Sequence, residues 1–448
     1  MADRYWISTA GTKYWDDDAN WSATDTGAGG VSFPVAGDNV YFTAASSTVT
    51  CLLRDHEACA IISIANGGIL DIVTFNLVSS GVMTLTNSNS TIKIGTSADT
   101  GLTTAGITWN TGSKRDWQLL SKINCSGNWI EPNEQIGSVT TARGAVTFTA
   151  SANVSKQYTN NMFNEFTINE GVSLTNTTVC QYTTSGSSKT IINGIINAQT
   201  FSMTCGSKDV FTLGANCDIL GTAGAWSVFI INTSTYTNSK TGTFSYNATI
   251  YNGINSSSTN WLLTGDFRNA TFAIVGGSSA SGTGIFVSGT LRIKNLQVIQ
   301  SANNDVIVNC ATNNPSFYIS DTINFKNDTA TYTLTWTKGT GTITINGSSG
   351  THNIDFQGKS IEDVIFDSVG TIKQIVSNFT TDSISGSVGT LQSSVAGTQR
   401  TITCSGTAVL TAGSIKDISM GVANKMNAKA CTNLGNNAGI VFTDTLKI

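Results

Sequence analysis

The densest group of side chains able to do chemistry lies between residues 109 and 134. It combines three tryptophans with three carboxylates, in a chain whose charged share of 12% is about half that of a typical soluble domain. Aromatic faces bind the apolar faces of sugars. Glycoside hydrolysis uses two carboxylic acids, since one protonates the leaving oxygen and the other activates water or attacks. The candidate carbohydrate-binding residues are Trp109, Asp116, Trp117, Trp129, Glu131 and Glu134.

Two other roles compete with sugar binding for this segment. Cleavage ranks below binding, so no catalytic residue is assigned and the chain is expected not to be an enzyme. The structural alternative is an inserted loop that packs on the chain's own core or on a neighbouring subunit, and we rank this role first. If the chain repeats about every twenty residues, Trp109 and Trp129 lie one above the other on the same face.

Two further acidic groups have structural explanations. The aspartates at 16–18 space oxygen ligands as a calcium loop does, but Trp21 stands where such a loop needs glycine. We therefore expect a solvated acidic turn and no metal site. Glu362, Asp363 and Asp367 lie among apolar strand residues, and we expect them on an outward, solvated face.

The histidines and cysteines carry no recognisable motif. The chain has two histidines and nine cysteines, and their irregular spacing argues against a metal finger and a full disulfide framework. We expect most of the cysteines to be small buried apolar residues. A glycine-rich phosphate loop followed by a helix is also lacking, so no cofactor is expected.

Short alternating runs fill the chain from about residue 45 onward and must position any of these groups. Thr91–Ile94, 146–149 and Thr342–Ile345 are examples, and Gly, Ser and Asn separate such runs. Alternation with a period of two places one set of side chains inward and the other outward. Many short strands with almost no helix predict an all-β chain, a parallel β-helix or β-solenoid in which each turn packs on its neighbours.

Composition divides the chain into a Trp/Gly-rich N-terminal capping module, a solenoid with an irregular section, and a C-terminal cap. The respective ranges are 1–45, 46–415 with the irregular section near 220–270, and 416–448. In the first module, Trp6, Trp15 and Trp21 are expected to form a small core rather than a sugar site, because so short a module has few other large apolar groups. In the last, we expect a short helix at 420–430 and a turn with a final strand at 436–442.

Charge and end sequences limit the partners. The net charge is −4, and no basic run provides the electrostatic footprint of nucleic-acid binding. No apolar stretch has transmembrane length, and the first residues lack the pattern of a secretory signal peptide. We therefore expect assembly in a cytoplasm, with no nucleic-acid partner and no membrane insertion.

Both ends of the chain resemble a known group of proteins. The residues that carry the resemblance are Arg4, Tyr5, Trp6, Ile7, Gly11, Thr12, Trp15, Asn20, Trp21, Ser22, Gly27, Gly30, Pro34, the run 38–42 and the run 435–442. They resemble β-solenoid proteins of tailed-phage virions and bacterial surfaces that have a Trp-rich N-terminal module. Ser8 and Thr9 stand where these proteins usually have glycines, and Ile440 stands where their closing strand usually has tryptophan. The middle of the chain shares with these proteins only the general pattern of short alternating runs.

The resemblance implies a bacteriophage virion structural protein, as a tail fibre, spike or head-associated fibre. Such a protein projects from the particle and mediates attachment to host-surface glycan. Virion proteins assemble inside the host and leave by lysis, which fits the expected lack of a signal peptide. The expected partners are other virion proteins, further copies of the chain as a homotrimer, and the glycan. The alternatives are a capsid decoration or cement protein, a polysaccharide depolymerase tailspike, and a bacterial surface adhesin.

Overall fold

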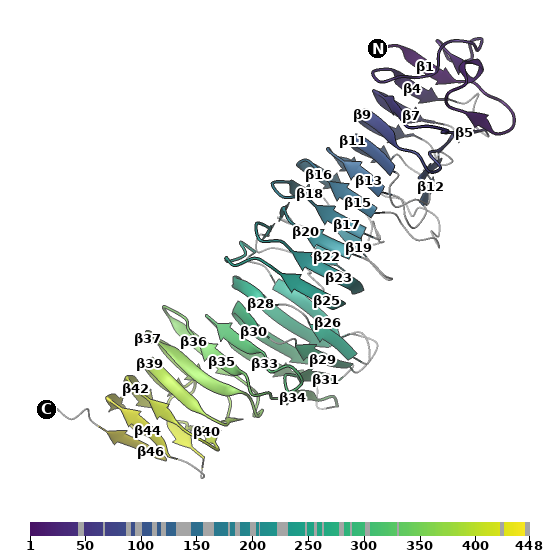
Figure 1. Ribbon diagram of the computed structural model, residues 1–448. Helices are drawn as coiled ribbons and strands as arrows, with labels where there is room; N and C mark the ends of the chain where they lie inside the picture. The colour runs from purple at the N-terminus through teal and green to yellow at the C-terminus, as the bar shows by residue number, and fades with distance from the viewer. Residues whose placement is uncertain are drawn as a thin grey trace. The chain divides into compact units, whose positions relative to one another are not determined.

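Strands make up almost all of the regular structure of this chain. It is all-β, with 1% of its residues helical, and it folds as a parallel β-solenoid, as the alternating runs predict. It divides into two compact units, Met1–Gly221 and Thr222–Ile448. Within each unit, strands of successive turns lie side by side (Figure 1). The computed structural model describes residues 1–43, 49–65, 68–86, 91–94, 101–109, 114–117, 122–130, 145–155, 165–177, 180–183, 189–197, 203–205, 207–221, 232–246, 249–254, 258–261, 264–276, 282–286, 289–300, 305–328, 331–421 and 425–443.

In Met1–Gly221, most strands belong to one long sheet. Its members are β1 (Asp3–Trp6), β3 (Trp21–Ser22), β4 (Asn39–Phe42), β6 (Glu57–Cys59), β7 (Ile61–Ile64), β9 (Leu77–Leu85), β11 (Gly101–Trp109), β13 (Lys122–Cys125), β14 (Trp129–Ile130), β15 (Ala145–Phe148), β16 (Ala152–Ser155), β17 (Glu165–Ile168), β18 (Ser173–Asn176), β20 (Lys189–Ile192), β21 (Ile195–Asn197), β23 (Ser207–Leu213) and β24 (Asp218–Leu220). A second sheet holds β2 (Lys13–Tyr14), β5 (Thr50–Leu52), β8 (Ile69–Asp71), β10 (Thr91–Ile94) and β12 (Lys114–Trp117), and a third holds β19 (Cys180–Thr183) and β22 (Met203–Cys205).

In Thr222–Ile448, β25 (Asn232–Asn238) comes first, and one sheet carries most of the remaining turns. Its members are β26 (Thr249–Ile254), β28 (Gly265–Gly276), β30 (Thr290–Gln300), β32 (Ser316–Ile319), β33 (Ile323–Asn327), β35 (Thr342–Ile345), β36 (Thr351–Asp355), β37 (Asp363–Ile375), β39 (Ile384–Ser393), β42 (Gly413–Lys416) and β45 (Cys431–Asn433). The smaller sheets are β27 (Ser258–Trp261), β29 (Gly282–Phe286), β31 (Val306–Asn309) and β34 (Leu334–Thr337); β38 (Phe379–Thr381), β40 (Arg400–Cys404) and β43 (Ile418–Met420); and β41 (Val409–Leu410), β44 (Met426–Lys429) and β46 (Ile440–Thr443).

The pair β15 and β17 shows how the sequence pattern builds a turn. Val146 and Phe148 of β15 are buried and alternate with half-buried residues. Phe166 of β17 lies in parallel register with Val146, and Ile168 lies in register with Phe148. Because equivalent positions of successive turns stack in register, apolar residues at alternate positions form a continuous dry core.

The N-terminal module has the tryptophan core that the sequence predicts. Trp6, Trp15 and Trp21 are fully buried. The Trp21 ring meets each of the other two edge to face, with ring centroids 5.1 Å apart in both pairs. β1 runs antiparallel to β3, whereas β1 with β4 is parallel and begins the solenoid. The three rings are therefore not open to a sugar, and they pack against the first turn through Phe42.

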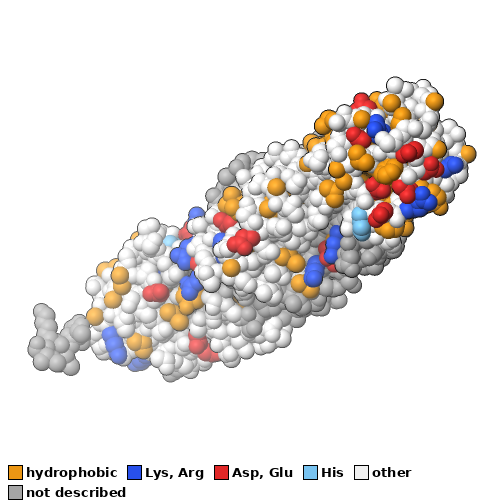
Figure 2. Space-filling model, turned by 45° about the horizontal axis from the view of Figure 1, so that its top comes forward, with side chains coloured by type: hydrophobic (Ala, Val, Ile, Leu, Met, Phe, Trp, Pro, Cys, Tyr) orange, Lys and Arg blue, Asp and Glu red, His pale blue; other side chains and the backbone are white. Residues whose placement is uncertain are grey.

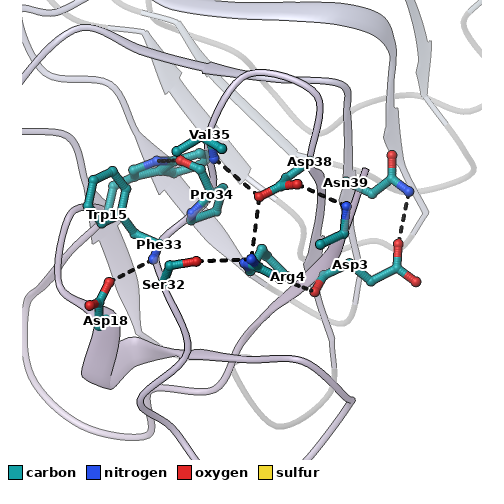
Figure 3. A network of polar contacts seen from close by, with 11 residues as sticks. Asp3, Arg4, Trp15, Asp18, Ser32, Phe33, Pro34, Val35, Asp38 and Asn39 are labelled. Atoms are coloured by element: carbon teal, nitrogen blue, oxygen red, sulfur yellow. Dashed lines mark hydrogen bonds and ion pairs between the residues drawn. The ribbon is translucent and has the colours of Figure 1, made fainter.

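Aspartates of this module hold its long loop, which contains Ser32 and Phe33, in place through hydrogen bonds and an ion pair (Figure 3). Asp18 accepts a hydrogen bond of 2.8 Å from the backbone N–H of Phe33. Asp38 lies 3.6 Å from the guanidinium of Arg4, which donates a 2.9 Å hydrogen bond to Ser32. The expected acidic turn at 16–18 thus has structural partners, since Asp17 also caps the short 3₁₀ helix η1 (Asp18–Asn20).

The C-terminal part differs from the expectation in one element. The helix expected at 420–430 is wrong, because its described residues include the end of β43 and the whole of β44. Met426 and Ala428 of β44 point into the core, and β44 pairs with β46 in parallel. Alternating burial across stacked turns outweighs the helix propensity of Ala, Met and Lys here. The expected final strand is present as β46.

Candidate functional site

A polar groove opens on the surface of Thr222–Ile448, across five stretches of chain that successive turns bring together. It has a volume of about 880 Å³. Its residues come from the segment before β26, from β28, from β30, from the end of β32 with the residues that follow it, and from β36 with the turn that precedes it. They are Ser245, Arg268, Asn269, Arg292, Ile293, Lys294, Tyr318, Ser320, Asp321, Asn346, Ser348, Ser349 and His352.

Arg292 and Tyr318 form an outward-facing pair in the groove. Arg292 of β30 lies in parallel register with Tyr318 of β32, and alternation turns both side chains away from the core, between the buried neighbours Leu291 and Ile293 on β30. The guanidinium carbon lies 3.9 Å from the centroid of the tyrosine ring. This stacked cation–π contact orients the guanidinium without using its N–H groups.

Arg268 is held by a neighbouring carboxylate. Its Nε donates to both oxygens of Asp266, over 3.0 and 3.1 Å, and the two side chains form an ion pair. Burial acts to raise the pKa of Asp266, but the hydrogen bonds and charge of Arg268 outweigh it and lower that pKa. Arg268 is therefore a fixed and largely neutralised edge of the groove.

Four titratable residues form a row on successive turns, and three of them, Lys294, Asp321 and His352, line the groove. Asp321 Oδ2 lies 4.0 Å from Nζ of Lys294, and Asp321 Oδ1 lies 3.3 Å from Nδ1 of His352. His352 of β36 pairs in register with Lys373 of β37. His352 is 3% exposed and Lys373 is 0% exposed, and neither the Nε2 of His352 nor the Nζ of Lys373 has a hydrogen-bond partner among the described residues.

Burial shifts the protonation of this row. It lowers the pKa of His352, the charge of Lys373 lowers it further, and Asp321 opposes both effects. Burial also lowers the pKa of Lys373 to about 8, against the opposing attraction of Asp321. His352 is therefore mainly neutral at pH 7, and Lys373 is mainly charged in a site that disfavours charge.

Asp321 and His352 are arranged as in the acid–imidazole part of a hydrolytic triad. The third member is missing, because Nε2 of His352 has no hydroxyl partner among the described residues. Gly347 also packs closely on this side of the ring, since a Cβ placed on that glycine would lie 2.4 Å from Nε2. The imidazole is thus screened from any substrate in the groove, and the geometry suits binding better than acyl transfer.

The residues proposed from the sequence lie elsewhere, in Met1–Gly221. Trp109 and Trp129 are 1% and 0% exposed, with ring centroids 6.2 Å apart. The two rings are on neighbouring turns and face inward, but the strict stacking expected from a twenty-residue repeat is shifted, because Trp129 pairs in register with Ile107. Neither ring has a face open to a sugar, and both belong to core strands, β11 and β14, rather than to an inserted loop.

The other four candidates are only partly described. Asp116 and Trp117 belong to β12, whose backbone pairs with β10, and their side chains are outside the described part of the structure. Glu131 and Glu134 also lie outside the described residues. Carbohydrate binding by these four residues stays a prediction.

Glu362 departs from the expectation of an outward, solvated carboxylate. It is 1% exposed, and it accepts 2.9 Å hydrogen bonds from Nε1 of Trp336 and from the backbone N–H of Gly339. Burial raises the pKa of Glu362, while these hydrogen bonds oppose the rise. The residue ties the loop after β34 to the next turn, whereas Asp367 is exposed, as expected.

Sequence reasoning missed the groove, although its cations leave a signal. Arg268 and Arg292 stand one turn length apart in a chain with few charges. Figure 2 shows how sparse charged side chains are on the face it draws, away from the end that holds the N-terminal module. A search for charges that recur at the turn length would have drawn attention to this part of the chain.

Within the described residues, no group of three or more His, Cys, Asp or Glu side chains is placed to hold a metal ion. No helix in the described part of the chain is long and apolar enough to cross a membrane. Comparison with known proteins finds no matching family model, curated protein or solved structure.

Proposed function

We propose that this chain is a non-enzymatic attachment protein of a bacteriophage particle and that it binds host-surface glycan through the polar groove. The groove is the observation that carries the binding part. The virion part depends on the resemblance at the two ends of the chain, and the parallel β-solenoid fold is compatible with it. Other virion proteins and further copies of the chain, as a homotrimer, are the proposed partners.

The lining of the groove fits a sugar chain. Hydroxyl and amide side chains supply donors and acceptors for sugar hydroxyls, and Tyr318 with Arg292 supplies a planar surface. Ile293 is the one aliphatic residue in the lining, which makes the groove a poor fit for an apolar ligand. Single sites of this kind bind weakly, so several copies acting together would supply firm attachment.

Depolymerase activity is the less favoured alternative for this groove. Glycoside hydrolysis ordinarily needs two carboxyl groups on either side of the scissile bond. Among the described residues of the lining, Asp321 is the one carboxylate, and it is already engaged by His352 and Lys294. The remaining alternatives, a capsid decoration protein and a bacterial surface adhesin, differ from the proposal in location rather than in the chemistry of the groove.

Binding is tested by measuring retention of the full-length protein on host cells and on their purified surface polysaccharide. Tyr318→Ala should lower retention about two- to fivefold, since it removes the planar surface and the cation–π contact that orients Arg292, which contributes about 0.5–1 kcal/mol at an exposed site. Tyr14→Ala is the matched control, because the guanidinium carbon of Arg54 lies 4.0 Å from the centroid of the Tyr14 ring. This similar pair is in Met1–Gly221 and not in the groove. Equal retention of Tyr318→Ala and the unsubstituted protein would count against the groove.

The virion part has a separate test. Mass spectrometry of purified particles should detect the protein at a fixed ratio to the capsid protein. Its absence from particles, together with presence on a bacterial surface, would overturn the virion proposal in favour of an adhesin and would leave groove binding intact.

A further inference from the structure

The charge of the groove differs in sign from that of the whole chain. The described residues of its lining include three cations, Arg268, Arg292 and Lys294, and one carboxylate, Asp321, whereas the chain has a net charge of −4. Asp266, which lies in register with Arg292, neutralises Arg268. Local positive charge on an acidic protein indicates a ligand that carries negative charge.

Arg292 is the cation best placed to meet such a ligand. Its described contact is with the face of Tyr318. Asp266, its in-register neighbour on β28, is paired with Arg268, and Asp321 of the lining contacts His352. A guanidinium offers a planar fork of N–H donors that matches a carboxylate or phosphate group through two parallel hydrogen bonds. Stacking on the ring fixes that fork in advance, which reduces the entropy lost on binding.

A buried donor next to the groove strengthens the same preference. The Nζ of Lys373, which lies in register with the groove residue His352, has no hydrogen-bond partner among the described residues, although this side chain is fully buried. An unpaired buried ammonium is unfavourable by itself. Its charge acts through a poorly screened interior, so an anion in the groove would offset part of that cost.

We propose that the groove recognises an acidic glycan, whose carboxylate or phosphate group pairs with Arg292 while the hydroxyl side chains around it bind the sugar ring. Lys294 contributes a second charge, and Lys373 acts as a positioning residue that keeps the groove positive without touching the ligand. This inference depends on the proposed function and adds the chemical class of the ligand.

The test uses the full-length protein on an array of glycans in matched pairs. One arm compares uronic-acid and sialic-acid glycans with their carboxyl-reduced forms, and a second arm compares phosphate-bearing glycans with dephosphorylated forms. The acidic member of at least one pair should bind about tenfold or more tightly, as expected for a charge-assisted hydrogen bond. The arm that responds identifies carboxylate or phosphate as the source.

Substitutions locate that preference. Arg292→Gln should abolish the difference between acidic and neutral members, and Arg292→Lys should restore part of it, because lysine keeps the charge but loses the planar fork. Arg54→Gln, in the matched Arg–Tyr pair, should leave the difference unchanged. All variants should give the circular dichroism spectrum and the melting temperature of the unsubstituted protein.

The outcomes separate the two proposals. Equal binding of acidic and neutral members, or an acidic preference that survives Arg292→Gln, overturns the acidic-ligand inference while glycan binding stands. Failure to bind any glycan on the array or any host polysaccharide overturns the proposed function and this inference together.

Discussion

Glu57 lies half-buried on β6, close to the carboxylates of Asp16 and Asp55. Burial, together with the charges of these two carboxylates, raises the pKa of Glu57 to about 7. An acid whose pKa is raised by folding binds its proton more tightly in the folded state. The free energy of unfolding should therefore fall as the pH rises from about 4.5 to about 7, by about 1–3 kcal/mol.

Glu57→Gln should remove this loss, which urea unfolding at pH 5 and pH 8 would measure. Glu170→Gln is the control for deleting one carboxylate, because Glu170 is exposed and bonded to Asn216. If Glu57→Gln and the unsubstituted protein lose the same stability between the two pH values, Glu57 does not titrate as described.

Lys373 should destabilise the folded chain at neutral pH. Its pKa of about 8 lies below the ordinary value of 10.5, so the unfolded state binds the proton more tightly. The free energy of unfolding should rise with pH between about 8 and 10.5, and Lys373→Met should add about 2–3 kcal/mol at pH 7. Lys429→Met, at an exposed position of β44, is the control.

The same variant has a spectroscopic readout. Without the charge of Lys373, the pKa of His352 should rise, which NMR titration of the imidazole would detect. A stabilised protein that also loses its acidic-glycan preference would connect the buried ammonium with binding. An unchanged unfolding free energy would mean that Lys373 reaches solvent or a partner in solution.

At the scale of the element, an aromatic ladder holds successive turns of Met1–Gly221 together. Ring centroids are 6.3 Å apart between Trp129 and Phe148 and 6.0 Å apart between Phe148 and Phe166. Phe166→Ala should lower the free energy of unfolding by about 3–5 kcal/mol, and Phe166→Leu by less, because leucine fills part of the cavity. Denaturant unfolding measures both changes. A loss below about 1 kcal/mol for alanine would show that the neighbouring turns collapse into the space.

The strands themselves were predictable, because alternate side chains of a strand are buried. Apolar residues therefore recur at every second position in the short runs of the sequence. The same rule explains two buried polar residues, since His352 stands two places before Ile354 and Lys373 two places before Ile375. Alternation alone assigns both to the inward face.

The spacing of Arg268 and Arg292 points to this part of the chain, but the set of residues that lines the groove was not predictable, because turn length varies. Ile372 pairs with Thr390, 18 residues later, whereas Ile323 pairs with Ile354, 31 residues later. The longer turn contains Asn346, Ser348 and Ser349, which line the groove. An error of a few residues in a turn moves every later side chain to a different position, so a fixed repeat of twenty residues could not bring these groups together.

At the scale of the whole molecule, the sparse charges serve different ends in different places. The N-terminal module pairs its charges, Asp38 with Arg4 inside the module and Asp16 with Arg54 just after it. In the groove, Arg292 stacks on a ring and Lys373 is buried. The charges of Arg292 and Lys373 contribute little to the stability of the fold. Because they have no structural role of the kind that the paired charges of the module have, we assign binding to the groove.

A solenoid transmits stress only between neighbouring turns, and this locality can be measured. In Phe166→Ala, hydrogen exchange should quicken in β15, β17 and β20, whose registers include or adjoin the substituted position. Amides of β35 and β37 in Thr222–Ile448 should keep their protection, because stability in such a fold is a sum over turns and their nearest interfaces. Exchange should be followed by mass spectrometry at the temperature where the unsubstituted protein is fully folded. Equal loss of protection in both compact units would show a single cooperative transition, and turn-by-turn stability would then have to be abandoned.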